Sequence, residues 1–211
     1  MSDTSRTARS SVTVVVPSLG GAARLNETLP PILRAVDERC TQGDEVLVID
    51  DSGKDAAAGA VPEILGGLDR AGRAASVRVV SMGGNEGFGA AVMRGAQEAE
   101  GEYLFVCQDD VIVDEAILAP LVDALVRDAE VFAVTPRVRA VLVDGSHAPR
   151  YETGVRLALI DDRIVVREIG SDEESSEPED ADASGVTDGV GEPRVVDFVP
   201  SSAFMVRRDE F

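Results

Sequence analysis

The sequence predicts an α/β protein whose mostly parallel central sheet is covered by helices on both faces. Between residues 11 and 136, apolar runs rich in β-branched residues alternate with segments whose apolar residues recur at helical spacing. This alternation favours a parallel sheet, because parallel strands need long crossover connections that helices usually supply. With 211 residues, 44% of them hydrophobic, the chain is long enough to bury a core.

The first strand and helix are expected within residues 12–36. Residues 12–16 form a β-branched run that ends at Pro17, which indicates a buried strand. Apolar residues at helical spacing follow, and Pro30 and Pro31 are expected near the start of that helix. These apolar residues are Leu25, Leu29, Ile32, Leu33 and Val36.

The following elements repeat this pattern. Further strands are expected at residues 46–49, 77–80, 103–107 and 131–134. Helices are expected at residues 56–68, where the periodicity is weaker, and at residues 88–99 and 117–126. A glycine-rich turn, Gly83–Gly84–Asn85, leads into the helix at residues 88–99.

Beyond Pro136 the alternation ends, and residues 138–143, 155–160 and 164–169 are expected to form antiparallel strands or hairpins. Asp161–Asp162 fit a turn between the last two. Residues 170–193 hold nine acidic residues and no Lys or Arg, so they cannot bury enough apolar surface to become ordered. We interpret them as a disordered loop, with a functional acidic lure as the alternative, and residues 1–10 as a disordered tail.

The acidic charge balance makes two classes of partner unfavourable. The chain has 39 acidic and 20 basic residues, a net charge of −19, which disfavours nucleic acids and anionic membranes. It contains no run of 18 apolar residues, and its polar N-terminus lacks the apolar core of a signal peptide. Its two cysteines, Cys40 and Cys107, lie in different elements, which suits a reduced, cytoplasmic protein.

Polar residues follow three of the expected strands at the point where each strand ends. These residues are Pro17–Ser18, Asp50–Asp51 and Gln108–Asp109–Asp110. Parallel strands end at the same edge of a sheet, which is where α/β proteins bind ligands. Adjacent carboxylates there can hold a hard divalent cation and, through it, a diphosphate. The first strand is followed by P-S-L-G-G rather than a dinucleotide fingerprint, and Gly53–Lys54 lacks the context of a P-loop.

Four sequence blocks make this site more specific. They read V-V-V-P-S at residues 14–18, V-I-D-D-S-G-K-D at 48–55, N-E-G-F-G-A-A-V-M-R-G at 85–95 and G-E-Y-L-F-V-C-Q-D-D at 101–110. In this order and spacing they resemble the family 2 glycosyltransferases, which have the GT-A fold, a three-layer α/β/α sandwich, and use nucleotide-sugar donors. The resemblance covers residues 11–136 and 195–211. It departs from the family pattern at Ser52, which is shifted by one place, at Met93 and at Gln108.

The resemblance implies a nucleotide-sugar-binding half at residues 11–136. Asp50 would accept a hydrogen bond from the edge of the nucleobase, and a helix cap or turn acid is the alternative. Asp55 fits an N-cap of the following helix better. The implied donor-binding residues are Pro17, Ser18, Asp50, Asp51, Asn85, Gly87, Gly89, Arg94, Gln108 and Asp109.

The resemblance also implies a metal site. Asp110 would hold Mg²⁺ or Mn²⁺ against the donor diphosphate, and the cation would neutralise the charge that develops on the leaving nucleoside diphosphate. Gln108 stands where the family has Asp or Asn and would offer an amide oxygen or bind a ribose hydroxyl. Asp109 would face the ribose. The alternative for Asp110 is an acidic loop residue whose carboxylate is only solvated and binds no metal.

Around this site, Asn85, Gly87 and Gly89 would let the turn pass close to the donor, although a purely structural tight turn explains them nearly as well. Arg94 would reach a phosphate, with an exposed salt bridge as the default. His147, the only histidine, is expected on the surface.

An acceptor-side segment is implied for residues 137–211. Ser201 and Ser202 would leave room for the sugar or acceptor, and Arg207 and Arg208 are expected to be surface charges at the end of a strand. The catalytic base of inverting family members lies beyond the position of Phe211, so we assign no base and expect the chain to be truncated after the acceptor strand.

The sequence therefore predicts a GT-A domain that transfers a sugar, with inversion, from a nucleotide-diphospho-sugar to a hydroxyl of a glycan or lipid-linked acceptor. The rhamnosyl- and galactofuranosyltransferase-like members are closest in pattern. Cell-wall or surface-polysaccharide synthesis by a cytoplasmic protein is expected, with the inner face of the membrane as an alternative location for the full-length protein. The alternatives are a non-catalytic nucleotide-sugar-binding or scaffold module and a nucleotidyltransferase. P-S-L-G-G-A-A-R only faintly suggests the loop that a nucleotidyltransferase requires.

Overall fold

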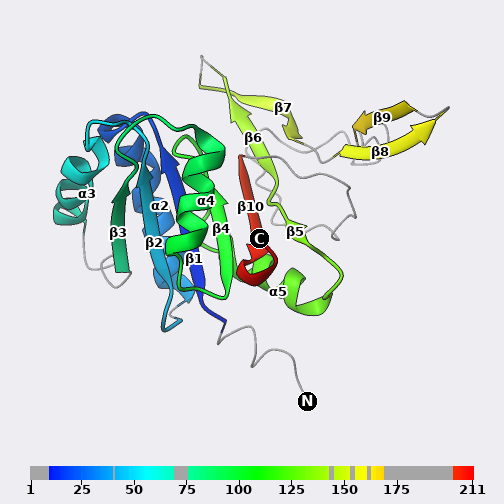
Figure 1. Ribbon diagram of the computed structural model, residues 1–211, viewed down its shortest axis with the longest axis horizontal. Helices are drawn as coiled ribbons and strands as arrows, with labels where there is room; N and C mark the ends of the chain where they lie inside the picture. The colour runs from blue at the N-terminus through cyan, green and yellow to red at the C-terminus, as the bar shows by residue number, and fades with distance from the viewer. Residues whose placement is uncertain are drawn as a thin grey trace. The chain divides into compact units, whose positions relative to one another are not determined.

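A six-stranded sheet with the strand order β3-β2-β1-β4-β10-β5 forms the centre of the larger of two units in the chain (Figure 1). The computed structural model describes residues 10–39, 41–68, 76–142, 145–152, 155–160, 163–168 and 202–211. The larger unit is Met1–Pro136 with Ser201–Phe211, and the smaller is Arg137–Pro200.

The sheet is mostly parallel, as the sequence predicts. Its strands are β1 (Val12–Ser18), β2 (Glu45–Asp50), β3 (Ser76–Ser81), β4 (Tyr103–Cys107), β5 (Ala133–Val134) and β10 (Ala203–Arg207). β1 pairs in parallel with both β2 and β4, and β2 pairs in parallel with β3. β10 runs antiparallel to β4 and β5, so the last described strand inserts beside the fourth.

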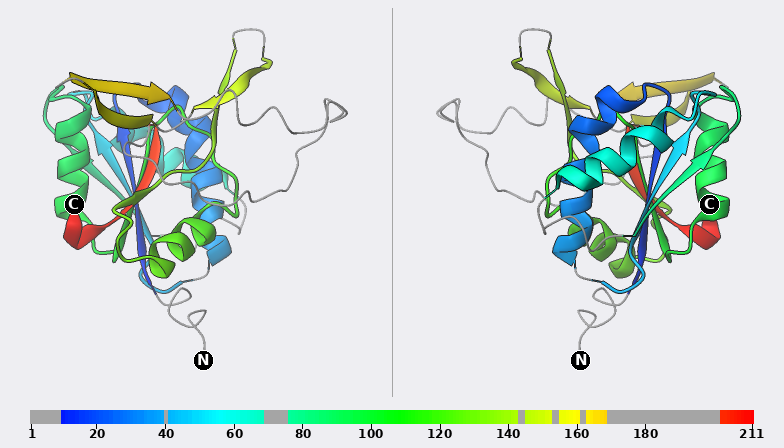
Figure 2. Two further views of the ribbon diagram at one scale, coloured as in Figure 1. Left: turned by 90° about the vertical axis from the view of Figure 1, so that its right-hand side faces the viewer. Right: turned by 90° about the vertical axis from the view of Figure 1, so that its left-hand side faces the viewer.

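Helices cover both faces of this sheet. They are α2 (Ala22–Arg39), α3 (Ala56–Gly67), α4 (Phe88–Glu98) and α5 (Leu118–Arg127). Figure 2 shows α4 on one face and α2 and α3 on the other, and α2 also packs against α5. The three-layer α/β/α architecture is therefore confirmed.

The central strands are apolar because both of their faces are covered. All seven residues of β1 are buried, and the same holds for every residue of β2 and β4. The layer of α4 lies especially close: a Cβ at Gly95 would lie 2.2 Å from Cγ1 of Val15, so only glycine permits this approach.

One helix differs from the prediction. α2 begins at Ala22, so Pro30 and Pro31 lie in its middle rather than near its start. The first turn carries only Leu25 of the apolar series, and the helical spacing therefore shows itself only from that residue onward. None of the helices in the described ranges is long and apolar enough to cross a membrane.

The smaller unit contains two antiparallel pairs. β6 (Val138–Val141) pairs with β7 (His147–Glu152), and β8 (Val155–Ile160) pairs with β9 (Arg163–Glu168). The predicted hairpin character of this region is confirmed, although β7, which begins at His147, is a strand that the apolar pattern does not reveal. The predicted turn at Asp161–Asp162, the acidic loop at 170–193 and residues 1–9 lie outside the described residues. The predicted disordered tail is wrong at Ser10, which is buried and whose carbonyl accepts a hydrogen bond from Arg39.

Candidate functional site

The ends of β1, β2 and β4 bring the predicted polar residues to one edge of the sheet. The register pairs Ser18 with Asp50, and the parallel β4 ends beside β1. This edge also receives the N-termini of the helices that follow the strands, and their backbone N–H groups favour anions.

Asp109 is the residue that joins two of these strand ends. It is only 5% exposed. Its Oδ2 accepts hydrogen bonds from the Ser18 hydroxyl at 2.7 Å and from the Gly20 N–H at 3.3 Å, and its Oδ1 accepts one from Nη1 of Arg24 at 3.3 Å. In this structure the carboxylate thus holds the turn after β1, and the ribose-facing role expected for it remains a prediction.

The neighbouring Asp110 has a different environment. Its side chain is 53% exposed, and Nη1 of Arg24 lies 3.8 Å from its Oδ2, too far for a hydrogen bond. Of the two adjacent carboxylates, Asp110 is therefore the one that has room for a ligand. Gln108 lies at the same strand end, and its N–H donates to the carbonyl of Ser202 at 3.0 Å, which brings the predicted acceptor-side Ser202 to this edge. Ser201 lies outside the described residues.

Asp50 is buried and serves the helix that follows it. Its Oδ1 accepts hydrogen bonds from the N–H and hydroxyl of Ser52, and its Oδ2 accepts one from the N–H of Ala57 at 2.7 Å. Burial alone would raise the pKa of Asp50, but these hydrogen bonds outweigh it and hold the pKa below its ordinary value. This geometry favours the helix-cap alternative over recognition of a nucleobase.

The prediction that the Asp55 side chain caps this helix is wrong. Asp55 occupies the N-cap position of α3 in a left-handed conformation, with φ of 50°, but its side chain makes no capping hydrogen bond. Asp50, seven residues before Ala57, supplies that bond instead. The left-handed turn at Asp55 places the end of β2 next to the first turn of α3. The carboxylate of Asp50 can therefore reach an N–H group that has no partner within the helix.

Asp51 holds the glycine-rich turn that precedes α4. Its two carboxylate oxygens accept hydrogen bonds from the N–H groups of Glu86 at 2.7 Å and Gly87 at 2.8 Å. Gly87 has a φ of 92°, which L side chains rarely adopt, so glycine is needed there. Asn85 in this turn is exposed, and so is Gly89, the second residue of α4. The turn is thus fixed to the sheet while its outer face stays open.

Three arginines that the sequence singles out have structural partners. Arg94 forms an exposed pair with Glu98 at 2.7 Å, as the default interpretation expects. The expectation of surface charges is wrong for Arg207, whose side chain is 15% exposed and donates to the carbonyls of Leu125, Asp128 and Val131. β10 carries Arg207 to the end of α5, where free carbonyls need donors. Arg208 donates to the carbonyls of Gly101 and Ala99.

Cys107, at the end of β4, is chemically quiet. Burial raises the pKa of its thiol to about 12, and the nearby charge of Asp110 adds to this. A thiol with this pKa stays protonated and is a poor nucleophile.

The site fits a divalent cation that is bound together with a diphosphate. Within the described residues, no three His, Cys, Asp or Glu side chains gather to form a metal cage. Mg²⁺ does not need one, because it is commonly held by one or two carboxylates together with substrate phosphates and water. Asp110 supplies one half-exposed carboxylate, and Gln108 beside it supplies no further charge.

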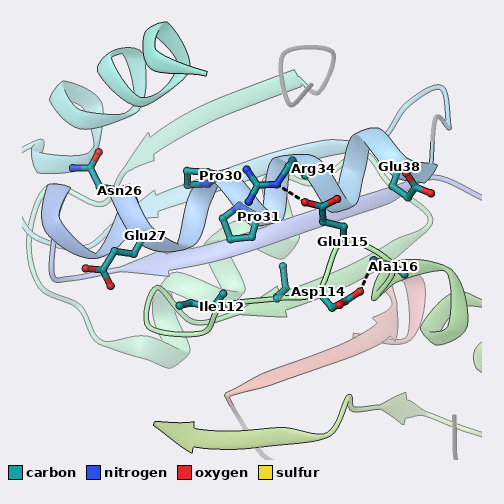
Figure 3. A pocket seen from close by; sticks show the side chains of 11 residues that line it. Asn26, Glu27, Pro30, Pro31, Arg34, Glu38, Ile112, Asp114, Glu115 and Ala116 are labelled. Carbon is teal, nitrogen blue, oxygen red and sulfur yellow. Dashed lines mark hydrogen bonds and ion pairs between the residues drawn. The ribbon is translucent and has the colours of Figure 1, made fainter. Parts of the chain in front are cut away.

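A groove that sequence reasoning did not find lies beside α2 (Figure 3). It has a volume of about 690 Å³ and is crossed by the ion pair between Arg34 and Glu115, whose atoms are 2.5 Å apart. Its walls are the middle of α2 and residues 112–116, which directly follow the strand-end acids. The two prolines inside α2, Pro30 and Pro31, line this groove. They are the feature of the sequence that marks this part of the helix.

Comparisons with known proteins agree with this architecture. The chain matches a solved mannosyltransferase, PcManGT from Pyrobaculum calidifontis in complex with GDP-Man and Mn²⁺, with 25% identity and a TM-score of 0.51. This match covers 62% of the chain but only 36% of the mannosyltransferase. A second match is S. aureus TarS 1–349, with 19% identity, a TM-score of 0.49, and coverage of 72% of this chain and 43% of that one.

No curated protein sequence matches the chain. The sequence model of the family described as glycosyl transferase family 2 matches residues 13–171, which is more than half of the chain. That span contains β1 except for Val12, the glycine-rich turn and all the strand-end carboxylates. The chain belongs to glycosyl transferase family 2.

Proposed function

We propose that this domain transfers a sugar from a nucleotide-diphospho-sugar to a hydroxyl group, with a divalent cation bound at Asp110. The observation that carries the proposal is the contrast between two adjacent acids at the end of β4. Asp109 is buried and bonded to the turn after β1, whereas the Asp110 carboxylate is half-exposed at a ligand-binding edge. Membership of the family makes a nucleotide-sugar the donor class.

The metal would be Mg²⁺ or Mn²⁺, held by Asp110 and the donor diphosphate. When bound, the cation neutralises charge on the leaving nucleoside diphosphate. The amide oxygen of Gln108 would complete the protein side of the site. The Mn²⁺ present in the mannosyltransferase complex supports this choice of metal.

The donor would lie across the ends of β1, β2 and β4. Asp51 fixes the turn that contains Asn85 and Gly87, so this turn and Gly89, at the start of α4, can be approached closely by the diphosphate or sugar. Pro17 and Ser18 would form the floor. In this arrangement Asp50 acts by holding α3 and the end of β2 in place rather than by binding the base directly.

The finer identity of the reaction rests on the sequence pattern. The N-E-G-F-G-A-A turn and the Q-D-D strand end favour a rhamnosyl- or galactofuranosyltransferase-like subtype, an inverting reaction and a role in cell-wall or surface-polysaccharide synthesis. A glycan or lipid-linked acceptor would approach on the side of Ser202, which lies beside Gln108. The cytoplasmic location remains part of this proposal.

Calorimetry tests the donor site directly. The protein is titrated with UDP, dTDP and GDP, each with and without Mn²⁺, and we expect metal-dependent binding of at least one. Asp110→Ala should abolish the metal dependence, whereas Glu115→Ala, which removes an exposed acid from the neighbouring groove, should leave it intact. Folded protein that binds none of the three with Mn²⁺ would contradict the assignment.

A non-catalytic nucleotide-sugar-binding module is the second candidate, because Gln108 replaces an acid at the strand end. Incubation with a panel of radiolabelled nucleotide-sugars and Mn²⁺ separates the two. Release of nucleoside diphosphate, with or without an added acceptor, supports the enzyme. Binding without release at any donor supports the module.

A further inference from the structure

A single arginine lies between the two acids at the end of β4. Nη1 of Arg24 is 3.3 Å from Oδ1 of Asp109 and 3.8 Å from Oδ2 of Asp110. The arginine side chain is 55% exposed, so the contact is open to solvent on one side. Arg24 thus neutralises part of the negative charge beside Asp110, the carboxylate that the proposed metal site uses.

The position of Arg24 in the chain is electrostatically unfavourable without those acids. It lies in the first turn of α2, whose N-terminal end carries a partial positive charge from its free N–H groups. That turn contains no acidic residue to offset it. The guanidinium is therefore held by carboxylates from another element, Asp109 and Asp110, which lie 85 or more residues away in sequence.

Gly20 provides a second, independent observation. A Cβ at residue 20 would lie 2.9 Å from Cδ of Arg24, closer than such atoms approach in proteins. Gly20 does not have the positive φ that demands glycine, unlike its neighbour Gly21 with φ of 69°. Glycine at position 20 therefore makes room for the Arg24 side chain to lie across the turn after β1.

We propose that Arg24 is the counter-cation of the donor-free site and that it exchanges partners when metal and donor enter. In the donor-free protein it pairs with Asp109 and Asp110, and in the loaded protein its guanidinium binds the donor diphosphate. This inference rests on the proposed function, since it assigns the residue that couples metal binding to donor binding at that site.

Elementary electrostatics favours the exchange. A divalent cation bound to Asp110 would repel a guanidinium held 3.8 Å from the same carboxylate. A partly exposed ion pair contributes little free energy, so breaking it is easy. The guanidinium fork matches phosphate oxygens well, and the positive end of α2 favours an anion at the same place.

The exchange predicts effects of opposite sign in one variant. Arg24→Gln removes the competing cation, so Mn²⁺ alone should bind about three- to fivefold more tightly to the donor-free protein. The same change removes a phosphate ligand, so GDP, UDP or dTDP, whichever binds the parent protein, should bind at least about tenfold more weakly in saturating Mn²⁺. Both are measured by calorimetry, with Mn²⁺ electron paramagnetic resonance as a second readout of free metal.

Two further variants separate position from charge. Arg34→Gln removes the same charge from the same helix, ten residues further along and paired with Glu115, and should change neither affinity. Gly20→Ala keeps every charge but displaces the Arg24 side chain, so it should shift both affinities in the directions seen for Arg24→Gln. Gly20→Ala also provides the test should Arg24→Gln fail to give folded protein.

The outcomes distinguish this inference from the proposed function. If the parent protein binds Mn²⁺ and a nucleoside diphosphate, but Arg24→Gln and Gly20→Ala leave both affinities unchanged or weaken both, the exchange is wrong and the donor site stands. If the parent protein binds no nucleoside diphosphate with Mn²⁺, the donor site itself is wrong and the exchange with it.

Discussion

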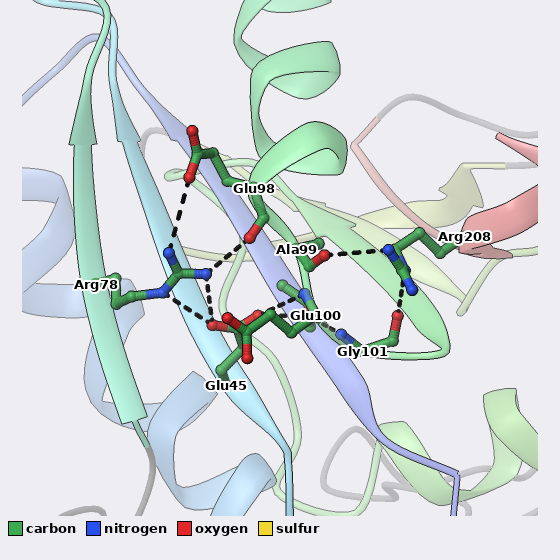
Figure 4. Close-up of polar contacts among 8 residues, drawn as sticks. Glu45, Arg78, Glu98, Ala99, Glu100, Gly101 and Arg208 are labelled. Carbon is green, nitrogen blue, oxygen red and sulfur yellow. Dashed lines mark hydrogen bonds and ion pairs between the residues drawn. The ribbon is translucent and has the colours of Figure 1, made fainter.

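Acidic residues and arginines lie at both edges of the sheet, the edge where the parallel strands begin and the edge where they end, but the number of their partners differs. At the edge where the parallel strands begin, Glu45 is 5% exposed and its Oε1 accepts hydrogen bonds from the Thr13 hydroxyl and the Glu100 N–H. Its Oε2 accepts two more from Arg78 (Figure 4). At the edge where the strands end, Asp110 stays half-exposed, with a single arginine at ion-pair distance.

The number of charged residues therefore does not locate the ligand site. What distinguishes the site is how few hydrogen-bond and ion-pair partners its carboxylate has. Charges buried at the first edge lie beside an opposite charge, because an unmatched buried charge is costly. Three atoms of the Arg39–Asp44 ion pair nevertheless make no hydrogen bond. A carboxylate that must bind and release a ligand needs weak partners instead. Substitutions at the first edge should therefore lower stability, whereas substitution of the half-exposed Asp110 at the second edge should mainly alter binding.

The largest loss of stability is expected for Asp44→Ala at the first edge. Asp44 and Arg39 are buried, with side chains 2% and 6% exposed, and Oδ1 of Asp44 also accepts the N–H of Val12. Burial raises the pKa of Asp44, and the Val12 N–H and Arg39 partly offset this. Removing the carboxylate leaves a buried arginine unpaired, which should lower the free energy of unfolding by about 3 kcal/mol in urea denaturation. Glu115→Ala, which breaks an exposed pair, should lose less than about 1 kcal/mol, and equal losses would contradict the comparison.

Gly101→Ala should have the next largest effect. A Cβ at residue 101 would lie 2.5 Å from the backbone nitrogen of Thr13, and backbone atoms cannot move aside cheaply. We expect the free energy of unfolding to fall by about 2 kcal/mol through this clash. Gly59→Ala is the matched control, because its Cβ would meet nothing within 4 Å and alanine favours the helix. An unchanged melting temperature in Gly101→Ala would show that β1 and β4 can separate at this end.

Asp50→Asn tests an acid at the second edge that is committed to structure. It should lower the free energy of unfolding by about 1–2 kcal/mol at pH 7, because the amide cannot replace every hydrogen bond to Ser52 and Ala57. The folded-state pKa of Asp50 is lowered, so this stabilisation is present above the unfolded pKa of about 3.9 and is lost as the pH falls through the folded value. The difference between parent and variant in urea denaturation should therefore narrow below pH 4.

The control for this prediction is Asp55→Asn, because the Asp55 side chain makes no capping hydrogen bond and asparagine tolerates its left-handed conformation. It should stay within about 0.5 kcal/mol of the parent protein at every pH. A difference for Asp50→Asn that persisted unchanged at pH 3 would show that the charge of Asp50 is not what stabilises α3.

Asp110→Asn should have the smallest effect on stability and the clearest effect on binding. The half-exposed carboxylate stabilises little, so the free energy of unfolding should change by less than about 0.5 kcal/mol. Mn²⁺ binding measured by calorimetry should fall below detection, whereas Glu115→Gln should leave it unchanged. A destabilised Asp110→Asn that still bound Mn²⁺ would place Asp110 among the structural acids and reverse the comparison.

Much of this arrangement was predictable from sequence. The ends of β1, β2 and β4, at Ser18, Asp50 and Cys107, are visible because apolar runs stop at or just before them, and parallel strands bring such ends to one edge. A glycine at position 87 could also be predicted to be required, because it lies in the glycine-rich turn before α4. The hydrogen-bond partners of Asp50 and Asp109 were not predictable. Adjacent acidic residues look alike in sequence and differ only in which donors the fold brings near them.

Arg207 and Arg24 show the same limit from the side of the cations. Nothing in the R-R pair at residues 207–208 indicates that the first arginine caps α5, because α5 lies some 80 residues earlier in the chain. Arg24 looks like an ordinary exposed residue of an amphipathic helix. Only the folded chain places its guanidinium between two carboxylates.

Local sequence patterns are enough to predict the alternation of strands and helices, the parallel sheet and the collection of polar residues at one edge. These features depend on periodic burial and on where apolar runs end, and both are local properties of the chain. The tertiary structure alone decided which acid is held and which stays available, for the bond between Ser18 and Asp109 joins residues 91 positions apart. Such a contact depends on the register of β1 with β4 and on the turn after β1, which no local pattern records.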